Sequence, residues 1–167
     1  MESLDRLSAE LGQLLLERQL VLATAESCTG GGVAMAITET AGSSAWFDRA
    51  FVTYSNEAKM EMLAVNADVL ATHGAVSEAI VVEMAHGALR CSKATTTVAI
   101  SGVAGPGGGS QEKPVGMVCF AWADSFGWSY TLTQHFAGDR SQIRKKAVYC
   151  ALEVLRDHYL LNQEETP

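Results

Sequence analysis

The sequence predicts an α/β fold: a single three-layer helix–sheet–helix domain with a mixed sheet, spanning residues 1–167. Three observations predict this class. Short apolar runs typical of buried strands alternate with longer segments of helical periodicity. Two strand-like runs near the end flank Asp124-Ser125-Phe126-Gly127, a turn signal that predicts an antiparallel pair. A length of 167 residues suits one domain with its own core.

Leucines at helical spacing predict an amphipathic helix at the start of the chain, with Ser3 placed to cap it. An apolar run rich in Leu, Val and Thr follows over 19–25 and predicts a buried strand. The rest of this half predicts, in order, a helix over 30–40, a strand over 47–54, a helix capped by Ser55 over 56–63 and a short helical turn over 67–71.

The second half begins with a helix that opens at Ser77-Glu78 and buries apolar side chains at helical spacing. It continues with a strand over 94–101, a glycine-rich loop over 102–109, strands over 115–123 and 128–136, and a helix over 139–159. The polar tail, Asn162 to Pro167, is expected to fray.

Composition and charge exclude several classes of protein. With 48% hydrophobic and 19% charged residues, the chain has the composition of a folded domain rather than a disordered one. A net charge of −7 argues against a nucleic-acid partner, because phosphate backbones bind basic faces. The start of the chain, Met1 to Arg18, does not have the pattern of a signal peptide. No apolar run approaches the roughly 20 residues that a membrane span needs.

Cysteine and histidine spacing indicates a cytoplasmic protein without a bound metal. The four cysteines lie far apart and form no C-x-x-C pair, so we expect reduced thiols. The four histidines show no spacing typical of a zinc site. Nothing in the sequence indicates a cofactor.

Three unusual segments follow predicted strands. They are the turn 25–32 (Ala-Glu-Ser-Cys-Thr-Gly-Gly-Gly), the segment 54–59 (Tyr-Ser-Asn-Glu-Ala-Lys) and the glycine-rich loop 102–110. In open α/β sheets, ligands bind outside the carboxyl ends of the strands. We therefore expect the three segments to meet around one site.

The first of these segments places Ser27 at a junction between a strand and a helix. Such a turn exposes its apical side chain and directs backbone N–H groups at a ligand, so a serine there could attack a carbonyl group whose oxyanion they stabilise. Three glycines at a helix start cost roughly 0.5–1 kcal/mol each relative to alanine. A close helix–sheet contact with a capping side chain explains them equally well. Cys28 is the rival nucleophile, although no sequence feature indicates a base for it.

Lys59 and Tyr54 are candidate partners of Ser27. If Ser55 caps the following helix, Lys59 lies about one turn in, where the helix dipole disfavours an ammonium group. Partial burial would lower the lysine pKa further, as a catalytic base requires, and Tyr54 could relay a proton. A core tyrosine and a solvated lysine would show the same spacing.

Two further segments are candidates for holding an anion. The N–H groups of the glycine-rich loop can surround a phosphate or a carboxylate, although a flexible hairpin loop would have the same composition. Residues 138–146 gather four cations at the start of the last helix, where a bound anion would offset their unfavourable interaction with the helix dipole. Arg140 is the preferred phosphate ligand because a guanidinium binds in a bidentate manner. Solvated lysines and an Arg140–carboxylate pair are the alternative.

Short motifs occur in a fixed order along the chain. They are Ala-Glu-Ser-Cys-Thr-Gly-Gly at 25–31, Tyr-Ser-Asn-Glu-Ala-Lys at 54–59, Gly-Ala-Val-Ser-Glu at 74–78, Ser-Gly-Val-Ala-Gly-Pro-Gly-Gly-Gly-Ser at 101–110, Lys-Pro-Val-Gly at 113–116 and Gly-Asp-Arg at 138–140. Together they resemble the CinA C-terminal domain family, and the resemblance extends over residues 4–160. The stand-alone members that the chain resembles most are nicotinamide-nucleotide amidohydrolases.

The resemblance implies hydrolysis of the carboxamide of nicotinamide mononucleotide to nicotinate mononucleotide and ammonia, in pyridine nucleotide salvage, without a metal or cofactor. It also implies a homo-oligomer. Ser27 would be the nucleophile, with Tyr54 and Lys59 as its activating partners in an order that stays open. The implied binding residues are Thr29 and Gly30 for the oxyanion, and Gly105, Gly107, Gly108, Gly109, Ser110 and Arg140 for the ribose phosphate. A non-catalytic nucleotide-binding or regulatory module is the main alternative, and a serine amidase for another small amide is a second.

Overall fold

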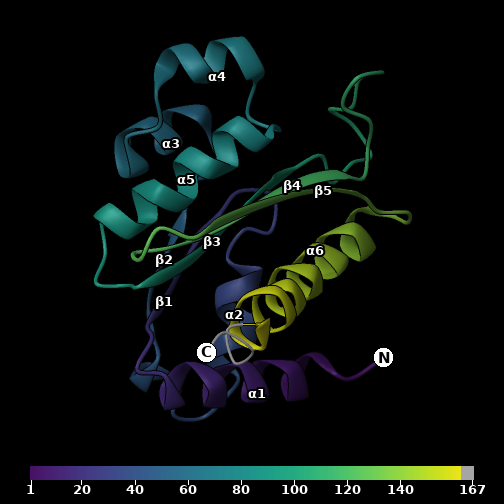
Figure 1. Cartoon of the computed structure of the whole chain (residues 1–167). Helices are drawn as coiled ribbons and strands as arrows, with labels where there is room; N and C mark the ends of the chain where they lie inside the picture. Colours follow the sequence, from purple (N-terminus) through teal and green to yellow (C-terminus); the bar gives the residue numbers. More distant parts are fainter. Residues whose placement is uncertain (163–167) are drawn as a thin grey trace.

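A five-stranded mixed sheet forms the middle layer of the computed structural model, which describes residues 1–162 (Figure 1). Its strands are β1 (Leu22–Glu26), β2 (Phe47–Val52), β3 (Thr96–Gly102), β4 (Met117–Asp124) and β5 (Ser129–His135), in the spatial order β2-β1-β3-β4-β5. β1 pairs in parallel with β2 and β3, whereas β4 runs antiparallel to both of its neighbours. The predicted fold class, with an antiparallel pair late in the chain, is confirmed. Apart from Asn162, the tail that was expected to fray lies outside the described residues.

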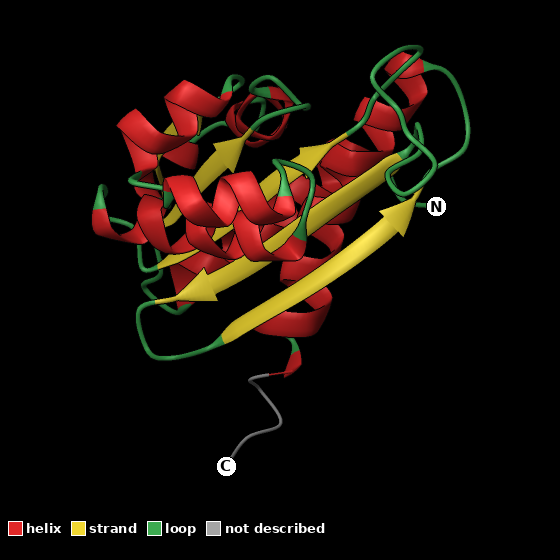
Figure 2. Ribbon diagram, turned by 90° about the horizontal axis from the view of Figure 1, so that it is seen from above, coloured by secondary structure: helices red, strands yellow, loops and turns green. Residues whose placement is uncertain are grey.

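Helices cover both faces of this sheet, which gives the predicted three layers (Figures 1 and 2). On one face lie α3 (Asn56–Leu63), α4 (Ala67–His73) and α5 (Glu78–Arg90). On the other face lie α1 (Leu4–Glu17), α2 (Gly32–Thr38) and α6 (Arg140–Val154), which continues into the π-helical segment η2 (Leu155–Leu160). A short 3-10 helix, η1 (Ser43–Ala45), precedes β2. No helix within residues 1–162 is long and apolar enough to cross a membrane.

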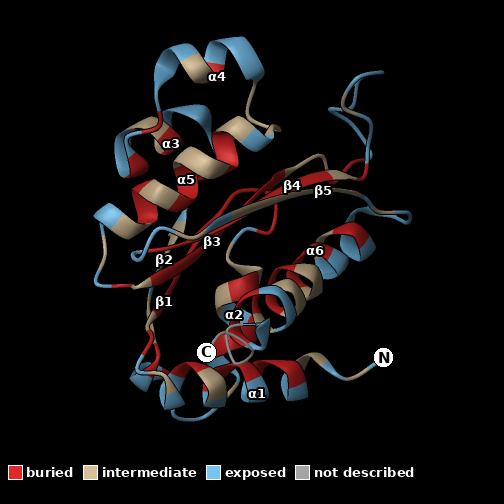
Figure 3. Cartoon of the chain, viewed as in Figure 1, coloured by how far each residue is buried: buried red, intermediate tan, exposed pale blue. Residues whose placement is uncertain are grey.

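The two faces of the sheet carry side chains of different size. Towards α1, α2 and α6 the strands present large side chains, among them Ile100, Phe120 and Trp122, which pack into one apolar cluster. Towards α5 they present small ones, namely Ala25, Ala99, Cys119, Ala121 and Ala123. Figure 3 shows the buried residues gathered on the sheet and on the helix faces turned towards it. Small side chains on the second face let α5 pack closely against the strands.

A close helix contact fixes the position of α3. Gly87 of α5 lies against Leu63, the last residue of α3, and a Cβ atom at Gly87 would be only 2.2 Å from the carbonyl oxygen of Leu63. Glycine is therefore the residue that allows α5 to approach α3 this closely. Because α3 carries Lys59, this contact also helps to position that side chain.

Glycine conformation moves the start of α2. The helix predicted over 30–40 begins only at Gly32, because Gly30 and Gly31 have positive φ values of 57° and 95°. Residues with such φ values cannot continue a right-handed helix and belong to the preceding turn. The turn that contains Ser27 is therefore longer than the sequence pattern suggested.

Two other helices differ from their predicted extent. The short turn predicted over 67–71 is a complete helix, α4, and the side chain of Asn66 caps it by accepting two backbone N–H groups. The last helix keeps α geometry only as far as Val154 and then widens into η2. Neither difference affects the placement of the segments that follow the strands.

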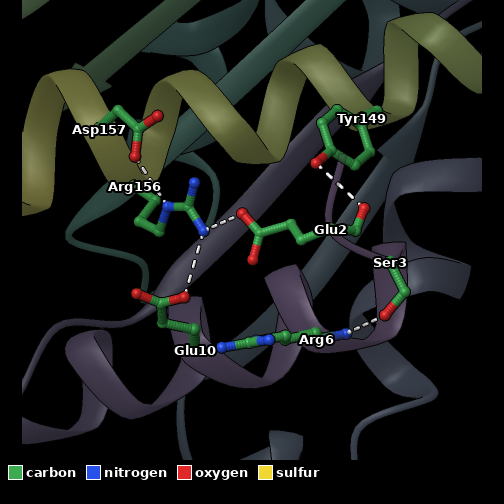
Figure 4. Close-up of polar contacts among 7 residues, drawn as sticks. All are labelled: Glu2, Ser3, Arg6, Glu10, Tyr149, Arg156 and Asp157. Carbon is green, nitrogen blue, oxygen red and sulfur yellow. Dashed lines mark hydrogen bonds and ion pairs between the residues drawn. The ribbon is translucent and has the colours of Figure 1, made fainter.

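Arg156, in η2, connects the two ends of the described chain (Figure 4). Its guanidinium donates to the carboxylates of Glu2 and Glu10 and, at 2.7 Å, to the carboxylate of Asp157. The hydrogen bond to Asp157, followed by that to Glu2, raises the pKa of Arg156. Tyr149 of α6 donates its hydroxyl to the backbone carbonyl of Glu2 at 3.2 Å. The segment before α1 is thereby fastened to the end of α6.

Candidate active site

Ser27 is the first residue after β1, and backbone hydrogen bonds fix its position. Its N–H donates to the carbonyl oxygen of Ile100 at 3.0 Å, which extends the pairing of β1 with β3 by one residue. Its own carbonyl oxygen accepts the N–H of Gly30 at 3.0 Å, which closes the turn. The serine is 8% exposed. Its hydroxyl group is therefore held at the carboxyl end of the parallel strands.

Glu26, the last residue of β1, organises the start of α2 from inside the protein. Its carboxylate is fully buried and accepts the backbone N–H groups of Val33 at 2.9 Å and Ala34 at 3.0 Å. It also accepts the hydroxyl groups of Thr24 and Thr29 at 3.0 and 2.8 Å. The N-cap residue of α2 is a glycine without a capping side chain, so Glu26 supplies the cap. Sequence reasoning missed this role, although an acidic residue ahead of a glycine-capped helix is a signal for it.

Lys59 lies in the first half of α3 and directs its amino group at Ser27. Its Nζ is 3.0 Å from Oγ of Ser27 and 2.8 Å from the carbonyl oxygen of Thr53. The lysine is 1% exposed, and desolvation by this burial lowers the pKa of Lys59 from its ordinary value of 10.5. Ser55 caps α3 by accepting the N–H of Ala58 at 3.0 Å, so Lys59 lies near the positive end of the helix dipole. Burial and dipole both favour the neutral amine.

A neutral Lys59 amine suits both of its contacts. One N–H donates to the carbonyl oxygen of Thr53, which leaves the nitrogen lone pair available to the hydroxyl of Ser27. In this protonation state the serine hydroxyl donates and the amine accepts. The pair then has the geometry that a lysine needs to remove the proton of a serine nucleophile.

Tyr54 and Arg140 contact each other beside this pair. The guanidinium of Arg140 donates to the phenol oxygen of Tyr54 at 3.2 Å and to the carbonyl oxygen of Gly105 at 2.8 Å. Tyr54 is 62% exposed, and within residues 1–162 its hydroxyl makes no hydrogen bond to Lys59. The structure thus brings the tyrosine to the arginine rather than to the lysine. A proton relay from Tyr54 to Lys59 has no direct contact to support it.

A cavity of about 310 Å³ joins these groups. The predicted site residues that line it are Ser27, Tyr54, Lys59, Gly105, Gly107, Gly108 and Arg140. Asn56 and Ser101, which sequence reasoning did not single out, add polar side chains to its wall. Among the described residues no carboxylate lines it, and Arg140 gives it a positive charge. In a chain of net charge −7, this cavity is a locally cationic place that suits an anionic small molecule.

The other predicted site residues lie outside the cavity wall. The hydroxyl of Thr29 donates to the buried carboxylate of Glu26, and the N–H of Gly30 is already used within the turn. Gly109 and Ser110 lie further along the glycine-rich loop, where the Ser110 hydroxyl accepts a backbone N–H at 3.0 Å. Of the four cations in the predicted basic cluster, only Arg140 lines the cavity.

Comparison with known protein families identifies the family to which the chain belongs. Residues 4–159 match the model of the CinA C-terminal domain, which is nearly the whole of the described chain. The chain belongs to the CinA C-terminal domain family. The resemblance that the ordered motifs indicated is confirmed.

Full-length relatives and solved structures of the CinA family are similar to this chain. It is 55% identical over 159 residues to the Escherichia coli K12 protein named nicotinamide-nucleotide amidohydrolase PncC, covering 95% of this chain and 96% of that protein. A protein of the same name from Enterobacter agglomerans is 49% identical, with 95% and 97% covered. The crystal structure of a competence/damage inducible protein from Agrobacterium tumefaciens superposes with a TM-score of 0.90 at 46% identity, covering 93% and 94% of the two chains.

The rival nucleophile of this CinA-family site is poorly activated. Cys28 lines the cavity next to Ser27, but burial raises the pKa of its thiol to about 11. The thiolate is the nucleophilic form, so near neutral pH Cys28 is protonated and unreactive. Ser27, in contrast, has an amine within hydrogen-bond distance.

Within residues 1–162, no group of histidine, cysteine and carboxylate side chains is arranged to hold a metal ion.

Proposed function

We propose that this chain hydrolyses the carboxamide of nicotinamide mononucleotide to nicotinate mononucleotide and ammonia. The observation that carries the proposal is the buried contact of 3.0 Å between Nζ of Lys59 and Oγ of Ser27. The substrate follows from the Escherichia coli relative, which is named for nicotinamide-nucleotide amidohydrolysis. A cavity lined by the Arg140 guanidinium and, among the described residues, by no carboxylate supports an anionic nucleotide in particular.

The reaction divides into two acyl transfers. Neutral Lys59 removes the hydroxyl proton of Ser27 while Oγ forms a bond to the carboxamide carbon. The tetrahedral intermediate then breaks its C–N bond, and the lysine ammonium donates its proton to the leaving nitrogen, which departs as ammonia. A water molecule attacks the acyl-serine with Lys59 again as the base. The ester bond breaks, the proton returns to Oγ, and nicotinate mononucleotide leaves.

Arg140 is the residue that we assign to the phosphate of the substrate. Its guanidinium lines the cavity and is oriented by Gly105 and Tyr54. A guanidinium suits bidentate phosphate binding. The N–H groups of Gly107 and Gly108, which also line the cavity, would add neutral donors. We assign Tyr54 to orienting Arg140 and covering the substrate, with its contribution to proton transfer left as a sequence-based prediction.

The decisive experiment measures ammonia released from nicotinamide mononucleotide, nicotinamide riboside, nicotinamide and NAD. The mononucleotide should be hydrolysed fastest, and Ser27→Ala should lower kcat by more than about 1,000-fold while the circular dichroism spectrum stays unchanged. Ser43→Ala is the matched control, because Ser43 is equally buried at 8% but lies outside the cavity. Full activity of Ser27→Ala would remove the serine from the mechanism.

The same panel separates the rival functions. Equal turnover of plain nicotinamide and its mononucleotide would favour a general serine amidase without a phosphate site. Binding of the mononucleotide, measured by calorimetry, without turnover of any compound would favour a nucleotide-binding module. Under the proposed function, Arg140→Ala should raise KM for the mononucleotide roughly 10-fold or more and leave hydrolysis of the riboside nearly unchanged.

A further inference from the structure

Arg144 reaches the turn of Ser27 from the opposite side to Lys59. It lies one helical turn after Arg140 in α6, and its Nε donates to the carbonyl oxygen of Cys28 at 3.0 Å. Its Nη2 donates to the carbonyl oxygen of Thr29 at 3.2 Å. Within residues 1–162 no carboxylate forms an ion pair with Arg144. The positive charge of this partly buried side chain is thus directed at two consecutive peptide groups.

Several backbone N–H groups in this turn are already used. That of Gly30 donates to the Ser27 carbonyl and that of Gly32 to the Thr29 carbonyl. The first N–H groups inside α2 donate to the carboxylate of Glu26. The helix N-terminus, which would be the usual place for an oxyanion, is therefore occupied. The N–H of Thr29, like those of Cys28 and Gly31, has no backbone acceptor within the described residues.

The orientation of that N–H group follows from Arg144. In a trans peptide the C=O and N–H bonds point in opposite directions. Arg144 binds the carbonyl oxygen of Cys28, so the N–H of Thr29, which belongs to the same peptide group, points away from Arg144 and α6. A cation on the carbonyl oxygen also polarises the peptide and strengthens its N–H as a donor.

We propose that Arg144 is a positioning residue that holds the N–H of Thr29 as a donor to the oxyanion formed when Ser27 attacks the carboxamide. The inference rests on the proposed function, since it concerns the same serine. Arg144 does not line the cavity, so its proposed role requires no contact with the substrate. Its effect is exerted on the transition state, in which the carbonyl oxygen becomes negatively charged.

Gly30 fits the same arrangement. It has a φ of +57°, and a Cβ atom built on it would lie 3.3 Å from Nη2 of Arg144. The turn therefore leaves room for a guanidinium at this point. A guanidinium can hold two neighbouring carbonyl groups at once because its donors form a rigid planar fork, which an ammonium lacks.

The test compares Arg144→Met, Arg144→Lys and the matched control Arg49→Met in two assays. Arg49 also donates to a backbone carbonyl, that of Cys91 at 3.3 Å, but lies outside the cavity. The first assay is ammonia release from nicotinamide mononucleotide. The second is the rate at which a fluorophosphonate labels Ser27, when Oγ bonds to phosphorus and fluoride leaves. The labelled adduct is tetrahedral at phosphorus and carries an oxygen at the oxyanion position. The labelling rate therefore reports stabilisation of that oxygen without the nucleotide.

Arg144→Met should lower kcat and the labelling rate roughly 10- to 100-fold with KM changed less than about 2-fold. Arg144→Lys should lose several-fold less, and Arg49→Met should match the wild type. In a further variant, Arg144→Ala, guanidinium ion added at a non-denaturing concentration should restore part of the activity by binding in place of the deleted side chain. If Arg144→Met does not fold, Arg144→Lys decides the question.

Two results would overturn the proposal. One is a variant that raises KM with unchanged kcat, which would make Arg144 a binding residue. The other is wild-type kcat and labelling in a folded Arg144 variant. Failure of the proposed function gives a different result. A wild-type protein that is labelled at Ser27 but releases no ammonia has another substrate, and the labelling rates of the variants then test the role of Arg144. A wild type inert in both assays removes both proposals.

Discussion

At the scale of the single residue, the amino group of Lys59 lies where a lysine is rarely found. It is nearly inaccessible to solvent, near the start of a helix, and its two hydrogen-bond partners are the hydroxyl of Ser27 and a backbone carbonyl. None of these partners carries a negative charge to compensate an ammonium group. The fold thus favours the neutral amine of Lys59, a form of lysine that is scarce in water at neutral pH.

The activity of the chain should increase with pH as Lys59 loses its proton. In the proposed mechanism the neutral amine is the base, and burial lowers the pKa of Lys59 from 10.5, so the midpoint of the rise in kcat/KM should lie below that value. Initial rates measured across the pH range on nicotinamide mononucleotide check this. Lys59→Arg should be inactive throughout, because a guanidinium stays protonated. A wild-type profile that is flat or that falls with increasing pH would exclude Lys59 as the base.

The same group also links stability to pH. Unfolding returns the pKa of Lys59 to its ordinary value of 10.5, above the lowered value in the folded protein. Between the two values the unfolded chain binds more protons, so the free energy of unfolding rises with pH there. Relative to Lys59→Met, the wild type should therefore gain stability with increasing pH over this window and then level off. Urea titrations at several pH values measure the difference, which would be constant if burial did not shift the pKa.

At the scale of the element, the unit formed by β1, the turn and α2 depends on a buried carboxylate. Glu26 occupies the place that a capping side chain would normally take and also holds the hydroxyl of Thr29. Its position is itself fixed by the parallel pairing of β1 with β2 and β3. The pairing of β1 in the sheet therefore helps to fix the conformation of the turn through the side chain of Glu26.

Glu26→Gln should lower the free energy of unfolding by about 2 kcal/mol, because the amide nitrogen of glutamine would face N–H or hydroxyl donors and leave one of them unsatisfied. Chemical denaturation measures the loss, and hydrogen exchange at Val33 and Ala34 should become faster. Glu39→Gln, at the exposed opposite end of α2, is the control and should change stability by less than about 0.5 kcal/mol. Equal stability of the two variants would show that the buried carboxylate does not support α2.

The sequence predicted which segments meet but not how they touch. The turn 25–32, the segment 54–59 and the loop 102–110 follow β1, β2 and β3, and parallel strands bring their carboxyl ends to one edge of the sheet. That argument needs only the order of elements. The hydrogen bond between Tyr54 and Arg140 joins residues 86 positions apart. No local spacing reports such a contact, so the sequence could not place Tyr54 beside Arg140.

Glycine positions were harder to interpret than strands. In the turn, Gly30 and Gly31 looked like the first residues of a helix, yet their positive φ values delay α2. Composition cannot distinguish a glycine needed for a turn from one needed for close packing, such as Gly87 against Leu63. The difference depends on neighbours that only the folded chain supplies.

At the scale of the whole molecule, hydrogen bonds join α1 and the residues before it to η2, near the other end of the described chain. Figure 4 shows Arg156 between the carboxylates of Glu2, Glu10 and Asp157. Its side chain is 12% exposed, so these contacts are partly shielded from solvent. The three-layer class itself was predictable, because it follows from alternating strand and helix patterns. This cross-chain contact was not, because its partners lie at opposite ends of the sequence.

Arg156→Met should lower the free energy of unfolding by about 2 kcal/mol, less than for a fully buried pair, because it leaves the carboxylates of Glu2, Glu10 and Asp157 without this cation. The amide protons of α1 should exchange faster, and kcat should change little because the cavity lies elsewhere. Arg49→Met removes the ion pair between Arg49 and Asp48, in which the arginine side chain is 44% exposed. It should lower the free energy of unfolding by less than about 1 kcal/mol. A loss no larger than that of the control would mean that the network adds no stability.

The position of α6 has a consequence for the time at which the site forms. Ser27 and Lys59 come from the first half of the chain, but the side chains of Arg140 and Arg144 that hold the loop and the turn come from near its end. A ribosome adds these arginines only after the five strands and helices α1 to α5 have been made. The nascent chain therefore carries the proposed nucleophile and base before the turn is fastened, and we expect hydrolytic competence to arrive in a single step, when α6 docks.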